Sequence, residues 1–305
     1  MALCSVKHMV MLARLPIAIG VLPTFFLGSL FALVNGNEFF LVNFLWGFII
    51  LFLIEIAAAY ANDYFDYEGD KHNKQFGFSG GSGILQKYPH LLSVAKWSAV
   101  FLFSVSLILT LLMVWHFSFP FWVAGYILTA ILFCWFYTAP PIKLAYRGLG
   151  ELPHLLAGIM FPGWGYLILT GTLDWPLFIF ALPFGFSGLT VILNFEIPDR
   201  EADLNAKKSN LIVIMGRRFT FKVIFGLYLF VSLYFFGLGM TGFLENKINF
   251  YIVGLLSLLP AFFSLLGAMK TTEKREVATR YAITTAVSHF LSVFLIMGYF
   301  IYLLA

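Results

Sequence analysis

The stretch Asn62-Asp-Tyr-Phe-Asp-Tyr-Glu-Gly-Asp70 places four carboxylates directly after a long apolar run. A second acidic stretch, Glu196-Ile-Pro-Asp-Arg-Glu-Ala-Asp203, repeats the carboxylates of the first position for position. Asp63 corresponds to Glu196, and all four pairs have the same separation of 133 residues (196 − 63). Two such clusters, each after a hydrophobic run, indicate an internal duplication in a membrane protein whose functional site lies between the halves.

The composition of this 305-residue chain is that of a helical membrane protein. Hydrophobic residues make up 61% of it and charged residues 11%, with a mean hydropathy of +0.90, which excludes an ordinary soluble domain. A membrane-spanning helix needs about 20 apolar residues. Nine runs of suitable length are predicted, at about 15–34, 41–61, 94–115, 118–138, 153–172, 176–195, 219–243, 248–268 and 281–304.

We therefore predict an all-α membrane protein with about nine transmembrane helices. The duplication predicts two four-helix parallel repeats and a final helix around a central cavity. The chain would be a single polytopic domain, 1–305, with repeat halves near 1–138 and 139–270 and the final helix near 281–304.

The basic residues predict how the chain is oriented in the membrane. Of its 19 Lys and Arg residues, 18 fall on alternate loops that share one side, and Lys247 is the exception. The positive-inside rule makes that side cytoplasmic. We expect an integral protein of the cell (inner) membrane, with both acidic stretches facing the cytoplasm. The net charge of +4 then reports topology, so it gives no reason to expect a nucleic-acid partner.

The carboxylates of each acidic stretch recur at helical spacing, so they share a helix face. Side chains four residues apart lie roughly 5–6 Å from each other, and carboxylates that close repel unless cations neutralise them. Oxygen ligands without His or Cys select a hard ion such as Mg²⁺. A solvated acidic helix end is the alternative. The predicted metal ligands are Asn62, Asp63, Asp66, Asp70, Glu196, Asp199 and Asp203.

Three further features admit two interpretations each. Glu55 lies inside an apolar run, where an ionisable residue is either functional or a protonated packing residue. Lys143 and Arg147 could balance an anionic leaving group, or they could be ordinary positive-inside charge. The Gly-rich loop 77–83 could be a lid that closes over a phosphate, or a flexible linker.

The two acidic stretches resemble the aspartate-rich motifs of the UbiA superfamily of intramembrane prenyltransferases, a family with nine transmembrane helices. Tyr146-Arg-Gly-Leu-Gly-Glu151 resembles the branch that includes the 1,4-dihydroxy-2-naphthoate prenyltransferase of menaquinone synthesis. The stretch 203–211 is similar to the family's continuation after the second motif and places Lys208 on a basic position. The chain departs from the family in its Gly-rich loop, which has no Lys or Arg between Lys74 and Lys87 where relatives often carry an Arg.

The resemblance implies that Mg²⁺ ions on the two clusters bind the diphosphate of a polyprenyl donor. Loss of diphosphate would leave an allylic cation, which aromatic faces can stabilise; the 37 Phe, 14 Tyr and 7 Trp mostly serve membrane packing. An aromatic acceptor would then be alkylated on carbon. The resemblance implies catalytic roles for Asp66, Asp199, Lys143, Tyr146, Glu151 and Glu55, and diphosphate contacts for Arg147, Lys208, Lys74 and Asn194.

Two alternatives remain open. The acceptor could be 4-hydroxybenzoate, homogentisate, a glycerol-phosphate lipid or a chlorophyllide-type ring instead of the naphthoate. The protein could also be a cation-coupled or proton-coupled transporter built from two repeats. The clusters lie at the cytoplasmic ends of helices, not near mid-membrane, and this position favours the enzyme.

Overall fold

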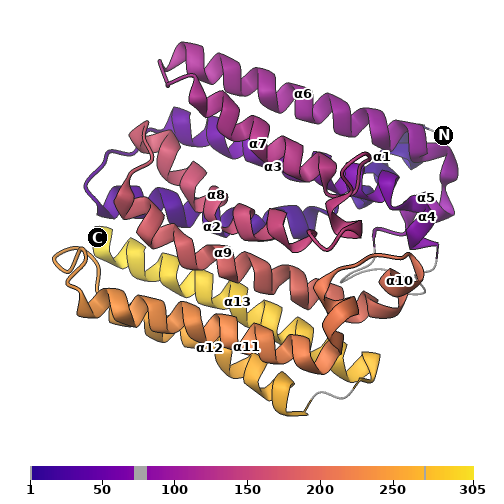
Figure 1. The fold of residues 1–305 in the computed structure, drawn as a ribbon. Helices are drawn as coiled ribbons and strands as arrows, with labels where there is room; N and C mark the ends of the chain where they lie inside the picture. The colour runs from indigo at the N-terminus through magenta and orange to yellow at the C-terminus, as the bar shows by residue number, and fades with distance from the viewer. Residues whose placement is uncertain (1, 72–80, 271–272) are drawn as a thin grey trace. The chain divides into compact units, whose positions relative to one another are not determined.

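The computed structural model describes residues 2–71, 81–270 and 273–305, which form helices joined by turns (Figure 1). For residues 2–6, 17 and 21 it describes the backbone alone. The long helices are α2 (Leu15–Val34), α3 (Leu41–Phe65), α6 (Leu92–His116), α7 (Trp122–Phe136), α8 (Glu151–Thr170), α9 (Trp175–Glu196), α11 (Leu211–Met240), α12 (Phe250–Lys270) and α13 (Arg275–Leu304). The short elements are α1 (Ala2–Leu12), α4 (Tyr67–Asp70), α5 (Ile84–Lys87), η1 (Pro89–Leu91), η2 (Leu144–Tyr146), η3 (Ile197–Asp199) and α10 (Arg200–Asn205).

Each predicted apolar run overlaps one of the long helices. A bilayer offers the backbone no hydrogen-bond partners, so an apolar run of this length must satisfy its own backbone as a helix. Among the described residues, seven helices are long and apolar enough to cross a membrane, and Ala18–Val34 and Trp122–Phe136 are shorter apolar helices. This confirms the all-α membrane class. The count of nine crossings, the repeats and the central cavity stay predictions.

The helices divide by their internal packing into two units, each built from separate parts of the chain. The first unit comprises Met1–Leu22, Leu41–Pro153 and Glu201–Asn210, and the second comprises Pro23–Phe40, His154–Arg200 and Leu211–Ala305. In the first unit α3 packs along α6, and α7 contacts both (Figure 1). The indole of Trp46 on α3 donates to the carbonyl of Leu109 on α6 at 2.9 Å. The organisation as a single domain with two repeat halves stays a prediction.

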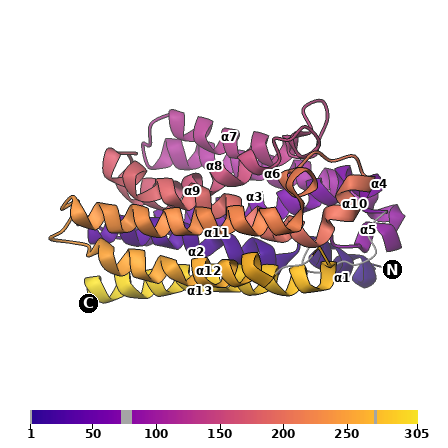
Figure 2. The same cartoon turned by 60° about the horizontal axis from the view of Figure 1, so that its bottom comes forward.

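In the second unit α11, α12 and α13 run alongside one another, and α9 packs against α11 and α13 (Figure 2). Aromatic side chains fill its core: the rings of Phe31 and Phe180 stack at 4.1 Å, and Phe300 lies against both. The Ser232 hydroxyl of α11 donates to the Gly254 carbonyl of α12 at 2.7 Å. Such hydrogen bonds and close packing hold helices together in lipid, where the hydrophobic effect does not.

Helices α2 and α8 approach each other through glycine within the second unit. A Cβ on Gly28 would overlap the backbone of Pro162, and one on Gly165 would overlap the carbonyl of Phe25. The Ser29 hydroxyl donates to the Gly165 carbonyl at 2.9 Å. Only glycine lets the two backbones come this close, which is the usual role of small residues between membrane helices.

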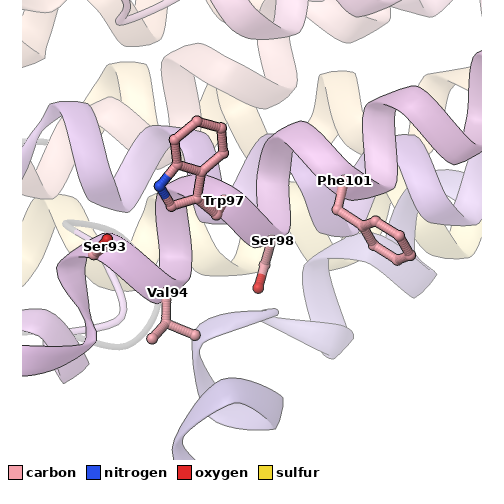
Figure 3. Close-up of a pocket in the computed structure, with 5 residues that line it drawn as sticks. All are labelled: Ser93, Val94, Trp97, Ser98 and Phe101. Atoms are coloured by element: carbon pink, nitrogen blue, oxygen red, sulfur yellow. The ribbon is translucent and has the colours of Figure 1, made fainter.

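The outer face of α6 is apolar and exposed in the structure. Trp97 is 63% exposed and Phe101 65%. Together with Ser93, Val94 and Ser98 they line a shallow hollow on this one helix (Figure 3). A face of this kind is covered by lipid in a membrane protein, and aromatic residues near its end suit the membrane interface. None of the predicted site residues lines the hollow.

Candidate functional site

The first acidic motif begins in the last turns of α3 and ends in α4. Asp66 connects the two helices with φ −88° and ψ 0°, and helical hydrogen bonds run from its N–H to the Asn62 carbonyl and from the Asp70 N–H to its own carbonyl. The chain therefore keeps a helical path from Asn62 to Asp70. This agrees with the predicted common face, although the side chains on it contact different partners.

Asp66, Tyr146, Asp203 and Lys208 form one contact network in the first unit, called here the Asp66 cluster. One oxygen of Asp66 accepts the Tyr146 hydroxyl at 2.8 Å, and the other accepts the Lys208 ammonium at 2.9 Å. The same ammonium lies 3.4 Å from Asp203. The Asn210 amide donates to the second Asp203 oxygen at 2.7 Å. Four predicted site residues from three separate stretches of the chain thus meet in space.

The Asp66 cluster is largely buried, so solvent screens the interactions between its charges only weakly. The side chains of Asp66, Asp203 and Lys208 are 12%, 11% and 14% exposed. Burial alone would lower the pKa of Lys208, but the Asp66 and Asp203 carboxylates raise it well above its ordinary value. Burial, and then the Asp66 charge, raise the pKa of the Tyr146 hydroxyl. At neutral pH, therefore, Lys208 is a cation and Tyr146 keeps its proton as a hydrogen-bond donor.

Asp70 lies beside this cluster, and the cations near it do not fully balance the charge of its carboxylate. Burial raises the pKa of its carboxyl to about 8, and the Asp66 and Asp63 carboxylates add to the rise. Lys208 and Arg14 act in the opposite direction but do not cancel it. A cation that binds beside such a half-buried carboxyl would stabilise its ionised form.

Asp63 is almost fully buried, at 3% exposure, and has partners of its own. It forms an ion pair with Arg14 and accepts a hydrogen bond from the Ser82 hydroxyl. The Ser82 backbone N–H donates to it as well, at 3.1 Å. Asp63 thus connects α3 to the Arg14 turn and to the end of the Gly-rich loop. Its predicted role as a metal ligand is untested by these contacts.

The first part of the second acidic motif lies in the second unit. Asn194 on α9 is fully buried, and its amide donates to the Thr190 carbonyl at 2.8 Å. Glu196 and Asp199 are 7% and 8% exposed. The Arg275 guanidinium lies 3.9 Å from Asp199. The motif is therefore divided between the units, because Glu201–Asn210 packs in the first.

The profile of the UbiA prenyltransferase family matches residues 21–294. The chain belongs to this family. A 146-residue stretch is 28% identical to "UbiA prenyltransferase domain-containing protein 1" of Dictyostelium discoideum; it covers 47% of this chain and 42% of that relative. The chain thus matches less than half of the relative's length.

Two solved structures of the family share the fold. A UbiA homolog from Archaeoglobus fulgidus bound to GPP and Mg²⁺ has a TM-score of 0.68 and 14% identity, covering 95% of this chain and 99% of that one. A structure of digeranylgeranylglyceryl phosphate synthase has a TM-score of 0.66 and 17% identity, covering 97% of this chain and 99% of that one. The predicted all-helical fold is thereby confirmed, and the count of nine crossings and the repeats stay predictions.

The carboxylates at this site are oxygen donors of the type that hard divalent cations prefer. Among the described residues, no three Asp, Glu, His or Cys side chains are near enough to ligate an ion as they lie. Asp66 and Asp203 nevertheless already turn toward one shared cation, the Lys208 ammonium. With the under-compensated Asp70 beside them, these oxygen donors fit a hard divalent ion.

The remaining predicted residues surround the cluster or lie apart from it. Lys143 is exposed, and its ammonium lies 5.2 Å from the centre of the Tyr146 ring. The Arg147 guanidinium donates to the Pro141 carbonyl at 2.9 Å. Glu151 is buried at the start of α8, and Glu55 lies in the middle of α3. Lys74 and residues 77–80 of the Gly-rich loop lie outside the described residues.

Sequence reasoning did not assign several partners of the motifs. The sequence assigned Arg14 no role in the site, whereas its guanidinium pairs with Asp63. Ser82 and Asn210 carried no signal beyond their proximity to a Gly-rich loop and to the second motif. Thr138, whose hydroxyl donates to the Asn62 side chain at 3.2 Å, carried none.

Proposed function

We propose that this protein is a prenyltransferase that transfers a polyprenyl group from its diphosphate to an aromatic acceptor, with Mg²⁺ as cofactor. The observation that carries the proposal is the convergence of Asp66 and Asp203 on Lys208 at the end of apolar helices. Membership of the family supports it, as does the fold shared with a homolog bound to GPP and Mg²⁺.

Mg²⁺ would be held by carboxylates of the two motifs, where it supplies positive charge to the diphosphate. Asp66, Asp70 and Asp203 are the ligands that the contacts favour, and Asn62, Asp63, Glu196 and Asp199 are those that the sequence pattern adds. Lys208 brings a permanent positive charge to the same place. Tyr146 fixes the orientation of one Asp66 oxygen through its hydroxyl.

The residues of the chain would promote departure of the diphosphate. The bond between the allylic carbon and the bridging oxygen breaks, and the diphosphate leaves with the electron pair. Lys208 would disperse the departing charge, together with the exposed Lys143 and Arg147 on either side of Tyr146 in the sequence, which is electrostatic stabilisation. Lys74 and Asn194 are further proposed diphosphate contacts.

A carbon of the electron-rich acceptor then forms the new carbon–carbon bond with the allylic cation. We propose 1,4-dihydroxy-2-naphthoate as the acceptor, in menaquinone biosynthesis, with loss of its carboxylate as carbon dioxide. An acceptor that instead loses a ring proton needs a base. Glu151 and Glu55 are the proposed bases, because Tyr146 is held in its protonated form.

The proposed setting is the cell (inner) membrane, with the site facing the cytoplasm. This follows from the distribution of the basic residues, of which 18 of 19 share one predicted side.

The experiment uses purified protein in lipid nanodiscs, a radiolabelled polyprenyl diphosphate and 1,4-dihydroxy-2-naphthoate, with Mg²⁺ or with a chelator. Asp66→Asn and Asp203→Asn should lower turnover roughly 10²-fold or more, since each removes a charge from the diphosphate site. Glu68→Gln is the matched control, because the Glu68 side chain is 78% exposed in the same motif. It should leave turnover unchanged.

The other outcomes decide between the alternatives. Prenylation of 4-hydroxybenzoate, homogentisate, a glycerol-phosphate lipid or a chlorophyllide in place of the naphthoate would keep the reaction and overturn the acceptor. No turnover with any acceptor, together with cation flux into liposomes, would overturn the enzyme in favour of a transporter.

A further inference from the structure

Two arginines bind the turn that carries Asp199 within the second unit. The Arg217 Nε donates to the carbonyl of Ile197 at 2.9 Å, and the Arg275 Nε donates to the carbonyl of Pro198 at 2.7 Å. These are the two residues immediately before Asp199, and all three form the 3-10 turn η3. The arginines come from different helices, α11 and α13, so the turn is held from two sides.

Arg217 is held in place by the structure around it. Its side chain is only 1% exposed, and a guanidinium is buried so deeply only where its donors are satisfied. A second donor, Nη1, bonds the carbonyl of Glu273 at 3.0 Å. Helix α11 breaks just before it, at Gly216, with φ 73° and ψ 163°. The Glu273 carboxylate accepts the N–H of Arg218 at 3.3 Å, where the helix restarts.

The turn needs partners of this kind because of its own sequence. The α-helix gives way here to a 3-10 turn, and Pro198 has no N–H to give to the helical hydrogen bonds. Guanidinium groups supply charge-assisted donors to the carbonyls of this turn. The pair Arg217 and Arg275 therefore restrains two consecutive carbonyls of the turn.

Arg275 also faces the carboxylate itself. Its Nη2 lies 3.9 Å from Asp199 Oδ1, with the two side chains 30% and 10% exposed. One arm of the guanidinium thus holds the backbone of the turn, and another faces the acidic side chain beyond it. A planar, forked cation can do both at once, whereas a lysine cannot.

We propose that Arg217 and Arg275 are positioning residues that set the orientation of Asp199 for binding a divalent cation and diphosphate. The inference rests on the proposed function, in which Asp199 is a metal ligand. Residues that orient a ligand in this way change metal affinity about 10–100-fold when they are replaced.

The first test measures the turn without any ligand. Hydrogen exchange followed by mass spectrometry on the full chain in nanodiscs should show exchange in peptides covering 196–203 that is about tenfold faster in Arg275→Ala than in the wild type, because a charge-assisted hydrogen bond is lost. Arg280→Ala is the matched control, since it removes the same charge from an exposed position on the same helix. Arg217→Lys, which keeps the buried charge, should also raise the exchange. Exchange equal to that of Arg280→Ala in both variants would overturn the inference.

The second test measures cation binding. Mn²⁺ is titrated into the protein with inorganic diphosphate and followed by electron paramagnetic resonance. Arg275→Ala should weaken Mn²⁺ binding about 10–100-fold, with binding by Arg280→Ala unchanged. Faster exchange with unchanged Mn²⁺ binding would refute the positioning role and leave a purely structural one. A wild type that binds no Mn²⁺ would refute the proposed function, and exchange would still show whether the arginines hold the turn.

Discussion

Replacement of Lys208 by Met should destabilise the protein in a way that Mg²⁺ reverses. At an effective dielectric constant of about 20, the attraction of the ammonium is about 6 kcal/mol to Asp66 at 2.9 Å and about 5 kcal/mol to Asp203 at 3.4 Å. Desolvation of the three groups offsets most of this. Removing one partner of such a buried arrangement costs about 3–5 kcal/mol, because the partners left behind are uncompensated.

The assay is thermal unfolding in nanodiscs with and without Mg²⁺. A loss of about 3 kcal/mol corresponds to a Tm lower by roughly 6–12 °C at about 2–4 °C per kcal/mol. A cation that takes the place of the ammonium and binds only the folded state returns about 2.7 kcal/mol at 100 times its Kd. Mg²⁺ should therefore raise the Tm of Lys208→Met more than that of the wild type.

Lys71→Met serves as the control. Lys71 pairs with Glu68, but the two side chains are 48% and 78% exposed, and such pairs contribute little. Its Tm should stay within a degree or two of that of the wild type. The reasoning is refuted if Lys208→Met has the same Tm as Lys71→Met. It is also refuted if Mg²⁺ raises the Tm of Lys208→Met by no more than it raises that of Lys71→Met.

Three further predictions follow from the site and the helix packing. Tyr146→Phe removes the 2.8 Å hydrogen bond to Asp66 and should lower kcat about tenfold with the donor KM little changed, as steady-state kinetics will show; unchanged kcat would contradict the orienting role. The Asp70 pKa of about 8 lies above the ordinary 3.8, so below pH 8 a proton must leave before a cation binds. Mg²⁺ affinity measured by calorimetry should therefore rise from pH 6 to pH 8 and level off above it, and a flat profile would contradict this. Gly28→Ala places a Cβ against the backbone of α8 and should lower the unfolding free energy by about 1–3 kcal/mol, whereas Gly125→Ala, which meets open space, should not; equal Tm values would contradict the close approach.

The helices could be predicted from the sequence because apolar length is a local property. The run predicted at 15–34 is α2, and the run at 176–195 differs from α9 by one residue at each end. The predicted starts of two helices were wrong, because the backbone conformation of a few residues determines where these helices begin. The run at 118–138 begins with Ser118 at φ 55° and a proline, so α7 starts only at Trp122, and α11 starts eight residues before the predicted 219, across the break at Gly216.

The pairing of the site residues could be predicted only in part. The spacing of Asp66 and Asp70 predicted a common face, and the family resemblance suggested Lys208. No local sequence pattern predicts that Lys208 bridges Asp66 and Asp203, because Lys208 and Asp66 are separated by 142 residues. Nor does the sequence distinguish Asp63, which faces Arg14, from Asp66 three residues later. Such choices depend on which distant segments pack together.

The contact between α2 and α8 has a consequence for how the chain is made. Ser29 and Gly165 are 136 residues apart, so the Gly165 carbonyl that accepts the Ser29 hydroxyl does not exist when α2 leaves the ribosome. At about 5–20 residues per second, translation takes roughly 7–27 s to reach Gly165. During that interval the glycine face of α2 has only lipid or the insertion machinery against it. The early chain must therefore wait in the membrane for its second half, and degradation by membrane proteases should be greatest for nascent chains arrested between these two helices.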